Sequence, residues 1–172
     1  MNKHHYVAIM AGGIGSRFWP MSRTDLPKQF LDILGTGKTL IQQTFERYGK
    51  LVPPENIYVI TAKEYVGIVK KQLPGIPEEN ILAEPSRKNT APCIAYIAFK
   101  LLKKDPKALM IAAPADNLIL ETDEFITTAK KALHFVDHIK CGFAHCCHGD
   151  GGNQERDGAT DKQANQYDGI GE

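Results

Sequence analysis

Short apolar segments that alternate with amphipathic ones constrain the fold of this chain more than any other feature. Four apolar segments have the length of strands: 6–10, 57–60, 81–83 and 108–113. Helical spacing of apolar residues occupies the segments between and after them: 40–48, 63–73, 90–104 and 123–138. A helix that links two strands of one sheet brings them parallel, through a right-handed crossover. The pattern therefore predicts an α/β fold with a mainly parallel sheet.

Three of these elements are predicted to be buried, the strand 6–10 among them. The helix near residue 90 contains a run, 93–99, that is apolar on nearly all sides, which is typical of a helix packed inside a protein. Asn89 or Thr90 can cap this helix, and Pro92 falls in its first turn. The strand 108–113 carries no charge and is expected to be buried as well.

A change in composition after Lys140 divides the chain of 172 residues. Residues 141–172 hold three of the four cysteines and seven of the fifteen glycines, but only one residue among Ile, Leu, Val and Met. Such a segment buries too little apolar surface to offset its ordering entropy. We expect residues 1–140 to form one domain and 141–172 to be an atypical polar Gly/Cys-rich tail, either disordered or translated out of frame.

Charge and hydropathy exclude several classes of partner. Lys+Arg number 21 against 20 for Asp+Glu, a net charge of +1, so a generally basic surface for nucleic acid is not expected. No apolar run approaches the length of a membrane span, and the N-terminus lacks the pattern of a secretory signal. These features predict a cytoplasmic protein that binds neither nucleic acid nor membrane.

The first strand runs into a glycine-rich segment, Ala11-Gly12-Gly13-Ile14-Gly15-Ser16-Arg17. Ligands of parallel α/β sheets bind beyond the carboxyl ends of the strands. Glycines there let backbone N–H groups face an anion, and an arginine adds a fork of donors suited to phosphate. A plain tight turn is the alternative. The third glycine of the dinucleotide-binding fingerprint is absent, which argues against NAD.

Two lysines follow the glycine-rich segment, and only the first is a candidate for binding phosphate. Lys28, between Pro27 and Gln29, would be a second cation near the end of the first strand. Lys38 lies in 35–39, which looks like the end of a P-loop, but the first glycine of that motif falls on Asp32. An acidic side chain there would repel phosphate, so we interpret 35–39 as a connecting loop.

Four segments in this order resemble the signature of the sugar-1-phosphate nucleotidyltransferases: 11–23, 27–30, 84–92 and 114–117. Within that family they are similar to the mannose-1-phosphate guanylyltransferases. Pro27-Lys28-Gln29-Phe30 favours this branch over the glucose-1-phosphate thymidylyltransferases, where Pro-Lys is typically followed by Pro. The resemblance implies a Rossmann-like sheet with helices on both faces, of the nucleotide-diphospho-sugar transferase type. It also implies a truncated chain, because family members continue well past this length.

The resemblance further implies a reaction in which a mannose-1-phosphate oxygen attacks the α-phosphorus of GTP, giving GDP-mannose and pyrophosphate. The catalytic residues would be Arg17 and Lys28, which hold the triphosphate and stabilise the leaving group. Asp116 would bind Mg²⁺, the implied cofactor, and Asn117 stands where this family often has His. The nucleotide would be held by residues of the first and third segments: Ala11, Gly12, Gly13, Gly15, Ser16, Glu84, Arg87, Asn89 and Thr90.

Several of these residues have purely structural alternatives. Asn89 and Thr90 can be helix caps only, Arg87 a solvated charge, and Asp116 the cap of a turn. Trp19 is expected to pack around the glycine-rich segment instead of stacking on a base.

The function has alternatives as well. In this family the second half supplies another metal-binding Asp and the mannose pocket, so the chain can be an inactive nucleotide-binding fragment, or act on another sugar-1-phosphate. A homo-oligomer is compatible with the sequence, which leaves the oligomeric state open.

Overall fold

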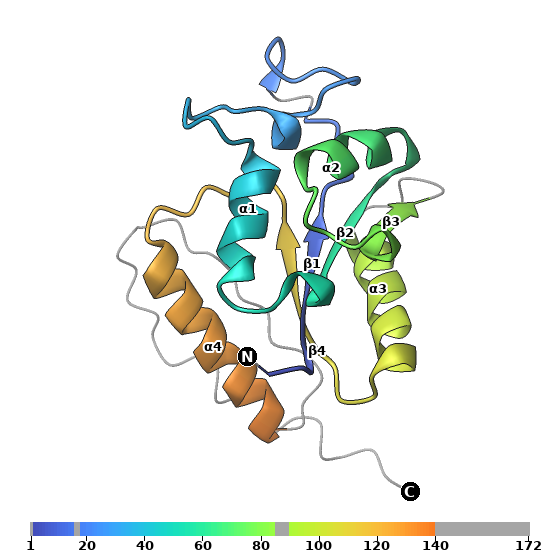
Figure 1. Ribbon diagram of the computed structural model, residues 1–172, viewed down its shortest axis with the longest axis vertical. Helices are drawn as coiled ribbons and strands as arrows, with labels where there is room; N and C mark the ends of the chain where they lie inside the picture. The colour runs from blue at the N-terminus through green and yellow to red at the C-terminus, as the bar shows by residue number, and fades with distance from the viewer. Residues whose placement is uncertain (1, 16–17, 85–89, 140–172) are drawn as a thin grey trace, which may run out of the picture.

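The computed structural model describes residues 2–15, 18–84 and 90–139 (Figure 1). Within them, the strands are β1 His5–Met10, β2 Ile57–Ala62, β3 Ile81–Glu84 and β4 Leu109–Pro114. The α-helices are α1 Leu40–Gly49, α2 Val66–Gln72, α3 Thr90–Lys104 and α4 Thr122–Ile139. Short 3₁₀ helices are η2 Lys28–Phe30, η3 Pro54–Asn56, η4 Lys63–Tyr65 and η5 Glu78–Asn80. The predicted tail, 141–172, lies outside the described residues.

The four strands form one sheet in the order β3-β2-β1-β4, and every neighbouring pair is parallel. In register, Val7 of β1 pairs with Ile57 of β2 on one side and with Ile111 of β4 on the other. The predicted α/β fold with a parallel sheet is therefore confirmed. Because all the strands run the same way, their carboxyl ends meet at one edge of the sheet, the upper edge in Figure 1.

Helices cover both faces of the sheet, because successive residues of a strand point to opposite sides. One face forms a core with α1, α2 and α4, to which the two central strands contribute Val7, Ile9, Ile57 and Val59. The other face packs against α3 through Tyr6, Ala8, Tyr58 and Ile60. This arrangement agrees with the predicted two-sided cover.

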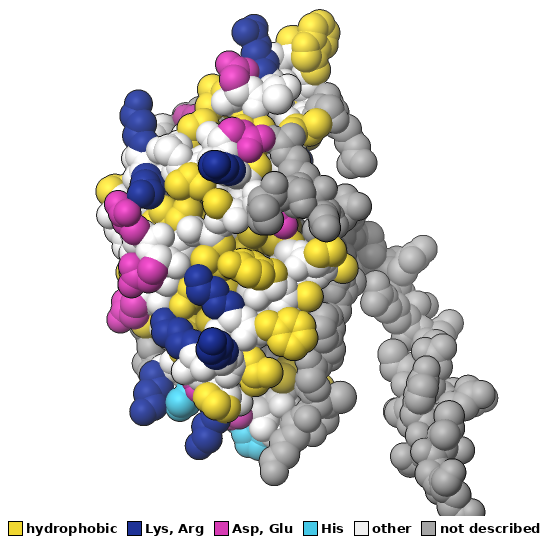
Figure 2. Space-filling view, turned by 90° about the vertical axis from the view of Figure 1, so that its right-hand side faces the viewer, with side chains coloured by type: hydrophobic (Ala, Val, Ile, Leu, Met, Phe, Trp, Pro, Cys, Tyr) yellow, Lys and Arg dark blue, Asp and Glu magenta, His cyan; other side chains and the backbone are white. Residues whose placement is uncertain are grey.

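Helix α3 is buried along one side only, which corrects the prediction that it packs inside the protein. Cys93, Ile97 and Leu101 face the sheet at a spacing of four residues. Tyr96 and Phe99, by contrast, are 55% and 72% exposed. Figure 2 shows the side of the molecule on which α3 lies, where apolar side chains reach the surface among lysines. A helix that is apolar all round needs neighbours on all sides, and the outer side of α3 is uncovered in the described part of the chain.

The prediction that 108–113 is a buried strand is also wrong for most of its length. Among the six residues of β4 only Ala113 is buried, and Ala112 is exposed. The physical reason is position, because β4 lies at the edge of the described sheet and has β1 on one side only. None of the described helices combines the length and the apolarity that crossing a bilayer requires.

Candidate functional site

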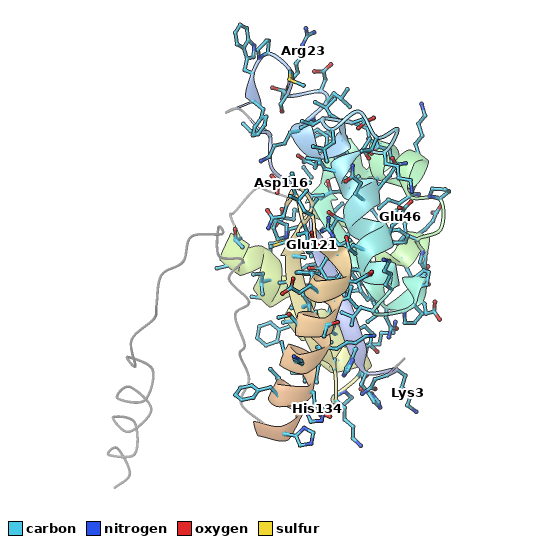
Figure 3. The ribbon with its side chains drawn as sticks, turned by 90° about the vertical axis from the view of Figure 1, so that its left-hand side faces the viewer. Lys3, Arg23, Glu46, Asp116, Glu121 and His134 are labelled. Atoms are coloured by element: carbon cyan, nitrogen blue, oxygen red, sulfur yellow. The ribbon has the colours of Figure 1, made fainter. Side chains whose placement is uncertain are left out.

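The carboxyl edge of the sheet gathers three of the predicted segments. Strand β1 leads into the glycine-rich segment, β3 ends at Glu84, and Asp116 follows two residues after β4. Since β1 pairs with β4, the segments that follow these two strands are neighbours in space. Figure 3 shows Asp116 toward this end of the molecule, with Lys3 and His134 at the opposite end.

Lys28 and Asp116 form an ion pair at this edge. Each side chain is 25% exposed, and Lys28 Nζ lies 4.8 Å from the centre of the Phe18 ring. Ion pairs that water can reach contribute about 1 kcal/mol or less, so this pair can open when each partner meets a stronger one. A phosphate would compete for the ammonium and a metal cation for the carboxylate. The structure thus joins the predicted catalytic lysine to the predicted metal ligand.

Helix α1 holds the loop that carries Asp116 from both sides of that residue. Thr44 Oγ1 donates to the carbonyl of Ala115 at 3.2 Å, and Arg47 Nη2 approaches the carbonyl of Asn117 at 3.5 Å. Arg47 is 6% exposed, its Nε has no partner among the described atoms, and burial lowers the pKa of its guanidinium. Sequence reasoning missed both α1 residues, although a lone arginine within a largely apolar helix face is a signal for such a contact.

The glycine-rich segment is constrained most strongly at Gly15. Its φ is +64°, and a Cβ built on it would lie 2.5 Å from Ser22 Oγ and 3.1 Å from Lys28 Cγ. Ser22, 2% exposed, donates from Oγ to the carbonyl of Ile14 at 3.1 Å and accepts from the backbone N–H of Lys28 at 3.0 Å. Sequence reasoning missed Ser22, which ties the glycine-rich segment to the lysine.

The backbone N–H groups of this segment differ in availability. The N–H of Ala11 donates to the carbonyl of Ile60 at 2.7 Å, so this predicted nucleotide-binding residue extends the strand pairing. The N–H groups of Gly12, Gly13, Ile14 and Gly15 donate to no other described atom. A run of such amides is a favourable surround for an anion.

Glu84 lies against the glycine-rich segment. A Cβ at Gly12 would be 3.2 Å from Glu84 Oε2, so the backbone at Gly12 packs closely on this carboxylate. Glu84 also hydrogen-bonds to Cys93, in the first turns of α3. Burial, together with the charge and hydrogen bond of Glu84, raises the pKa of the Cys93 thiol to about 11, so the thiol stays protonated at neutral pH.

The remaining predicted residues divide into described and undescribed ones. Thr90 is exposed and is the first residue of α3, where a cap or a ligand contact is sterically open. Trp19 is 77% exposed, so the expectation that it packs in the core is wrong. It lines a hollow of about 380 Å³ beside the glycine-rich segment. Four predicted residues lie outside the described residues: Ser16, Arg17, Arg87 and Asn89.

The P-loop-like segment before α1 is occupied by its own aspartate. Asp32 Oδ2 accepts from the N–H of Gly37 at 2.7 Å, and Oδ1 accepts from the N–H of Thr36 at 3.0 Å. Lys38 Nζ pairs with Glu46 at 2.7 Å on the surface. The amides that a phosphate would need are therefore taken, and the interpretation as a connecting loop agrees with these contacts.

The donor chemistry around Asp116 fits Mg²⁺ in part. Mg²⁺ is usually held by one or two carboxylates, with phosphate oxygens of the substrate and waters completing the octahedron. Asp116 supplies one carboxylate next to the candidate phosphate site, and no group of three or more His, Cys, Asp or Glu side chains suited to a metal gathers anywhere in the described ranges.

Comparison with known proteins identifies relatives of this chain. The chain is 41% identical over 136 residues to mannose-1-phosphate guanylyltransferase 2 of Escherichia coli O157:H7, a match that covers 77% of this chain and 28% of that protein. It is 43% identical over 116 residues to the alginate biosynthesis protein AlgA of Pseudomonas putida, covering 64% of this chain and 23% of that protein. The matched region thus spans about a quarter of the length of these curated relatives.

A solved structure and a family model also match this chain. The crystal structure of mannose-1-phosphate geranyltransferase from Thermus thermophilus superposes with a TM-score of 0.69 at 32% identity, covering 77% of this chain and 38% of that one. The sequence model of the nucleotidyl transferase family matches residues 6–142. On these matches and the arrangement of the carboxyl edge, the chain belongs to the nucleotidyl transferase family.

Proposed function

We propose that this chain supplies the nucleotide-binding part of an enzyme that makes GDP-mannose and pyrophosphate from GTP and mannose-1-phosphate. The main support is the Lys28–Asp116 pair beside the run of available amides at the carboxyl edge. The guanine nucleotide and the mannose phosphate are supported by the relatives whose names specify that activity.

The reaction needs no protein nucleophile, because the attacking phosphate oxygen is already ionised. The work of the protein is to hold two mutually repelling anions in line and to neutralise charge as it develops. The amides of Gly12 to Gly15 would face the triphosphate, and Lys28 would stabilise the α-phosphate and the departing pyrophosphate. Arg17 would add a second cation.

The nucleoside would lie beyond β3. Glu84 already contacts the glycine-rich segment, and Thr90 begins the helix that follows. Arg87 and Asn89, between them in the sequence, would complete this side of the site. When Lys28 turns to the phosphates it releases Asp116, which would then hold Mg²⁺; the ion would screen the charge of the triphosphate.

Nucleotide binding without transfer is a second candidate, as is transfer to another sugar-1-phosphate. The observation that favours binding alone is that the described residues supply a single candidate metal ligand and no candidate sugar site. A cytoplasmic location and assembly into a homo-oligomer stay predictions.

A thermal melt of the purified chain with Mg²⁺, alone and with saturating GTP or ATP, tests nucleotide binding. A ligand that binds only the folded state adds about 2.7 kcal/mol of stability at a hundredfold excess over its Kd. We expect GTP, and not ATP, to raise the midpoint. Release of pyrophosphate from GTP plus mannose-1-phosphate then separates the enzyme from the binding fragment.

Two lysine variants make this test specific. Lys28→Ala should leave the melt of the free protein nearly unchanged and remove the shift with GTP together with any turnover. Lys38→Ala is the matched control, because Lys38 pairs with Glu46 in the P-loop-like segment and should bind no phosphate. A GTP shift that survives Lys28→Ala, or one that disappears with Lys38→Ala in a folded protein, would refute the assignment.

A further inference from the structure

The side chain of Gln29 supports the glycine-rich segment from behind. Gln29 is 3% exposed, and its Nε2 donates to the carbonyl of Ala11 at 3.0 Å and to the carbonyl of Gly13 at 2.8 Å. A glutamine amide has two N–H donors, so both are used on this segment. Sequence reasoning used Gln29 only to choose between branches of a family and gave it no role.

These two hydrogen bonds fix the direction of the N–H groups on the opposite side. In a planar trans peptide the carbonyl of one residue and the N–H of the next point in opposite directions. When Gln29 draws the carbonyls of Ala11 and Gly13 inward, the N–H groups of Gly12 and Ile14 must point away from it. Ser22 donates to the carbonyl of Ile14, so by the same rule the N–H of Gly15 points away from Ser22.

The short helix η2 sends its three side chains in three directions. Successive residues of a 3₁₀ helix are about 120° apart. Lys28 reaches Asp116, Gln29 reaches the glycine-rich segment, and Phe30, 2% exposed, anchors the turn in the core against the ring of Tyr65, with ring centres 5.6 Å apart. One anchored turn therefore determines the position of the Lys28 side chain and of the neighbouring amides of the glycine-rich segment.

The two carbonyls depend on Gln29 to different degrees. Thr61 Oγ1 also donates to the carbonyl of Ala11, at 3.0 Å, so that oxygen keeps a partner if Gln29 is replaced. The carbonyl of Gly13 has Gln29 as its donor among the described residues. Loss of the glutamine amide should therefore act mainly on the peptide unit between Gly13 and Ile14.

We propose that Gln29 is a positioning residue, which turns the backbone N–H groups of the glycine-rich segment toward the polyphosphate of the nucleotide. The inference rests on the proposed function for the identity of the anion. The orientation of the amides is independent of the proposed function, because the two hydrogen bonds determine it in the free protein.

The test compares Gln29→Met with Gln43→Met in the full chain. Methionine keeps the length and apolar packing of glutamine but donates no hydrogen bond. Gln43 is a matched control, because its Nε2 also donates to two oxygens, Thr36 Oγ1 and the carbonyl of Lys38, both at 3.0 Å. Each variant is first shown to be folded by its denaturation curve.

Two readouts follow, GTP affinity by calorimetry and the order parameters of the Gly12 and Ile14 amides by ¹⁵N relaxation in the free protein. We expect Gln29→Met to raise the Kd for GTP by about tenfold or more and to lower the order of the Ile14 amide. Gln43→Met should change the Kd by less than about threefold. A folded Gln29→Met variant with unchanged affinity and unchanged amide order would overturn the inference.

Gln29→Glu adds a pH readout that a purely structural role would not give. The carboxylate has the same shape but faces two carbonyl oxygens, and burial there raises its pKa. GTP affinity relative to Gln29→Met should recover as the pH falls and the carboxyl group gains a proton to donate; no recovery, in a folded variant, counts against the inference. If the unmodified chain binds no GTP, the proposed function fails, and the amide order parameters still decide the role of Gln29.

Discussion

Replacing Gly15 by alanine probes the contact between the glycine-rich segment and the residues that support it. A Cβ at this position costs about 1–2 kcal/mol, because the φ of +64° lies in the left-handed region. The same atom would stand 2.5 Å from Ser22 Oγ, so Ser22 must move. Moving it breaks its two hydrogen bonds, worth about 0.5–1.5 kcal/mol each. We therefore expect a total loss of about 2–5 kcal/mol.

Urea denaturation of the full chain measures this loss. With a slope of about 2 kcal/mol per molar urea, the midpoint should fall by roughly 1–2.5 M. Gly13→Ala is the matched control from the same segment, because a Cβ there meets nothing within 4 Å and its φ is not positive. Its midpoint should stay the same or rise slightly, since alanine restricts the unfolded chain.

A double-mutant cycle separates the two costs. Ser22→Ala removes the oxygen nearest to the new Cβ and leaves Lys28 Cγ at 3.1 Å as the next side-chain neighbour, so Gly15→Ala in that background should lose the hydrogen-bond term and keep the backbone term of about 1–2 kcal/mol. Equal losses for the Gly13 and Gly15 variants, or an absence of coupling between Gly15 and Ser22, would refute this account of the segment.

Three further predictions concern groups away from the glycine-rich segment. The hydrogen bond from His4 lowers the pKa of Asp105 below 3.8. The stability that ionised Asp105 contributes is therefore present above pH 3.8 and is lost as the pH falls below it. Urea midpoints of Asp105→Asn and the parent chain should converge in acid. The thiol of Cys93, with a pKa of about 11, should resist alkylation at about pH 8 until urea is added, as peptide mass spectrometry would show. Arg47→Met should leave the unfolding free energy unchanged or raise it by up to about 2 kcal/mol, because it removes a buried charge that has no acidic partner among the described residues. A loss greater than about 1 kcal/mol in the urea curve would contradict this.

Two helical segments show how much secondary structure the spacing of apolar residues predicts. The segment 40–48 was predicted as a helix from the spacing of its apolar residues, and α1 spans Leu40–Gly49. The segment 63–73 was predicted as one helix, whereas the chain forms η4 first and α2 only from Val66. The spacing of apolar residues is nearly the same for a 3₁₀ turn and an α-turn, so the pattern places the element but does not distinguish its first turn.

The exposure of side chains could not be predicted from the spacing of apolar residues. The run 93–99 is apolar on nearly all sides, yet Phe99 is exposed because the described neighbours of α3 lie on one side only. Trp19 is predicted to pack around the glycine-rich segment, yet its side chain is exposed. Burial depends on which surfaces meet, and a single segment does not contain that information.

The sequence by itself determined the order and type of the elements, the parallel sheet and the position of the polar segments at the strand ends. Periodicity and the conformational freedom of glycine act over a few neighbouring residues, and the handedness of the crossover holds for almost any helix that links two parallel strands. Only the tertiary structure decided that Lys28 meets Asp116, that α1 holds the loop after β4, and that Gln29 donates to two carbonyls of the glycine-rich segment. Those contacts join residues far apart in the chain, and they form because parallel strands carry their ends to one edge of a sheet.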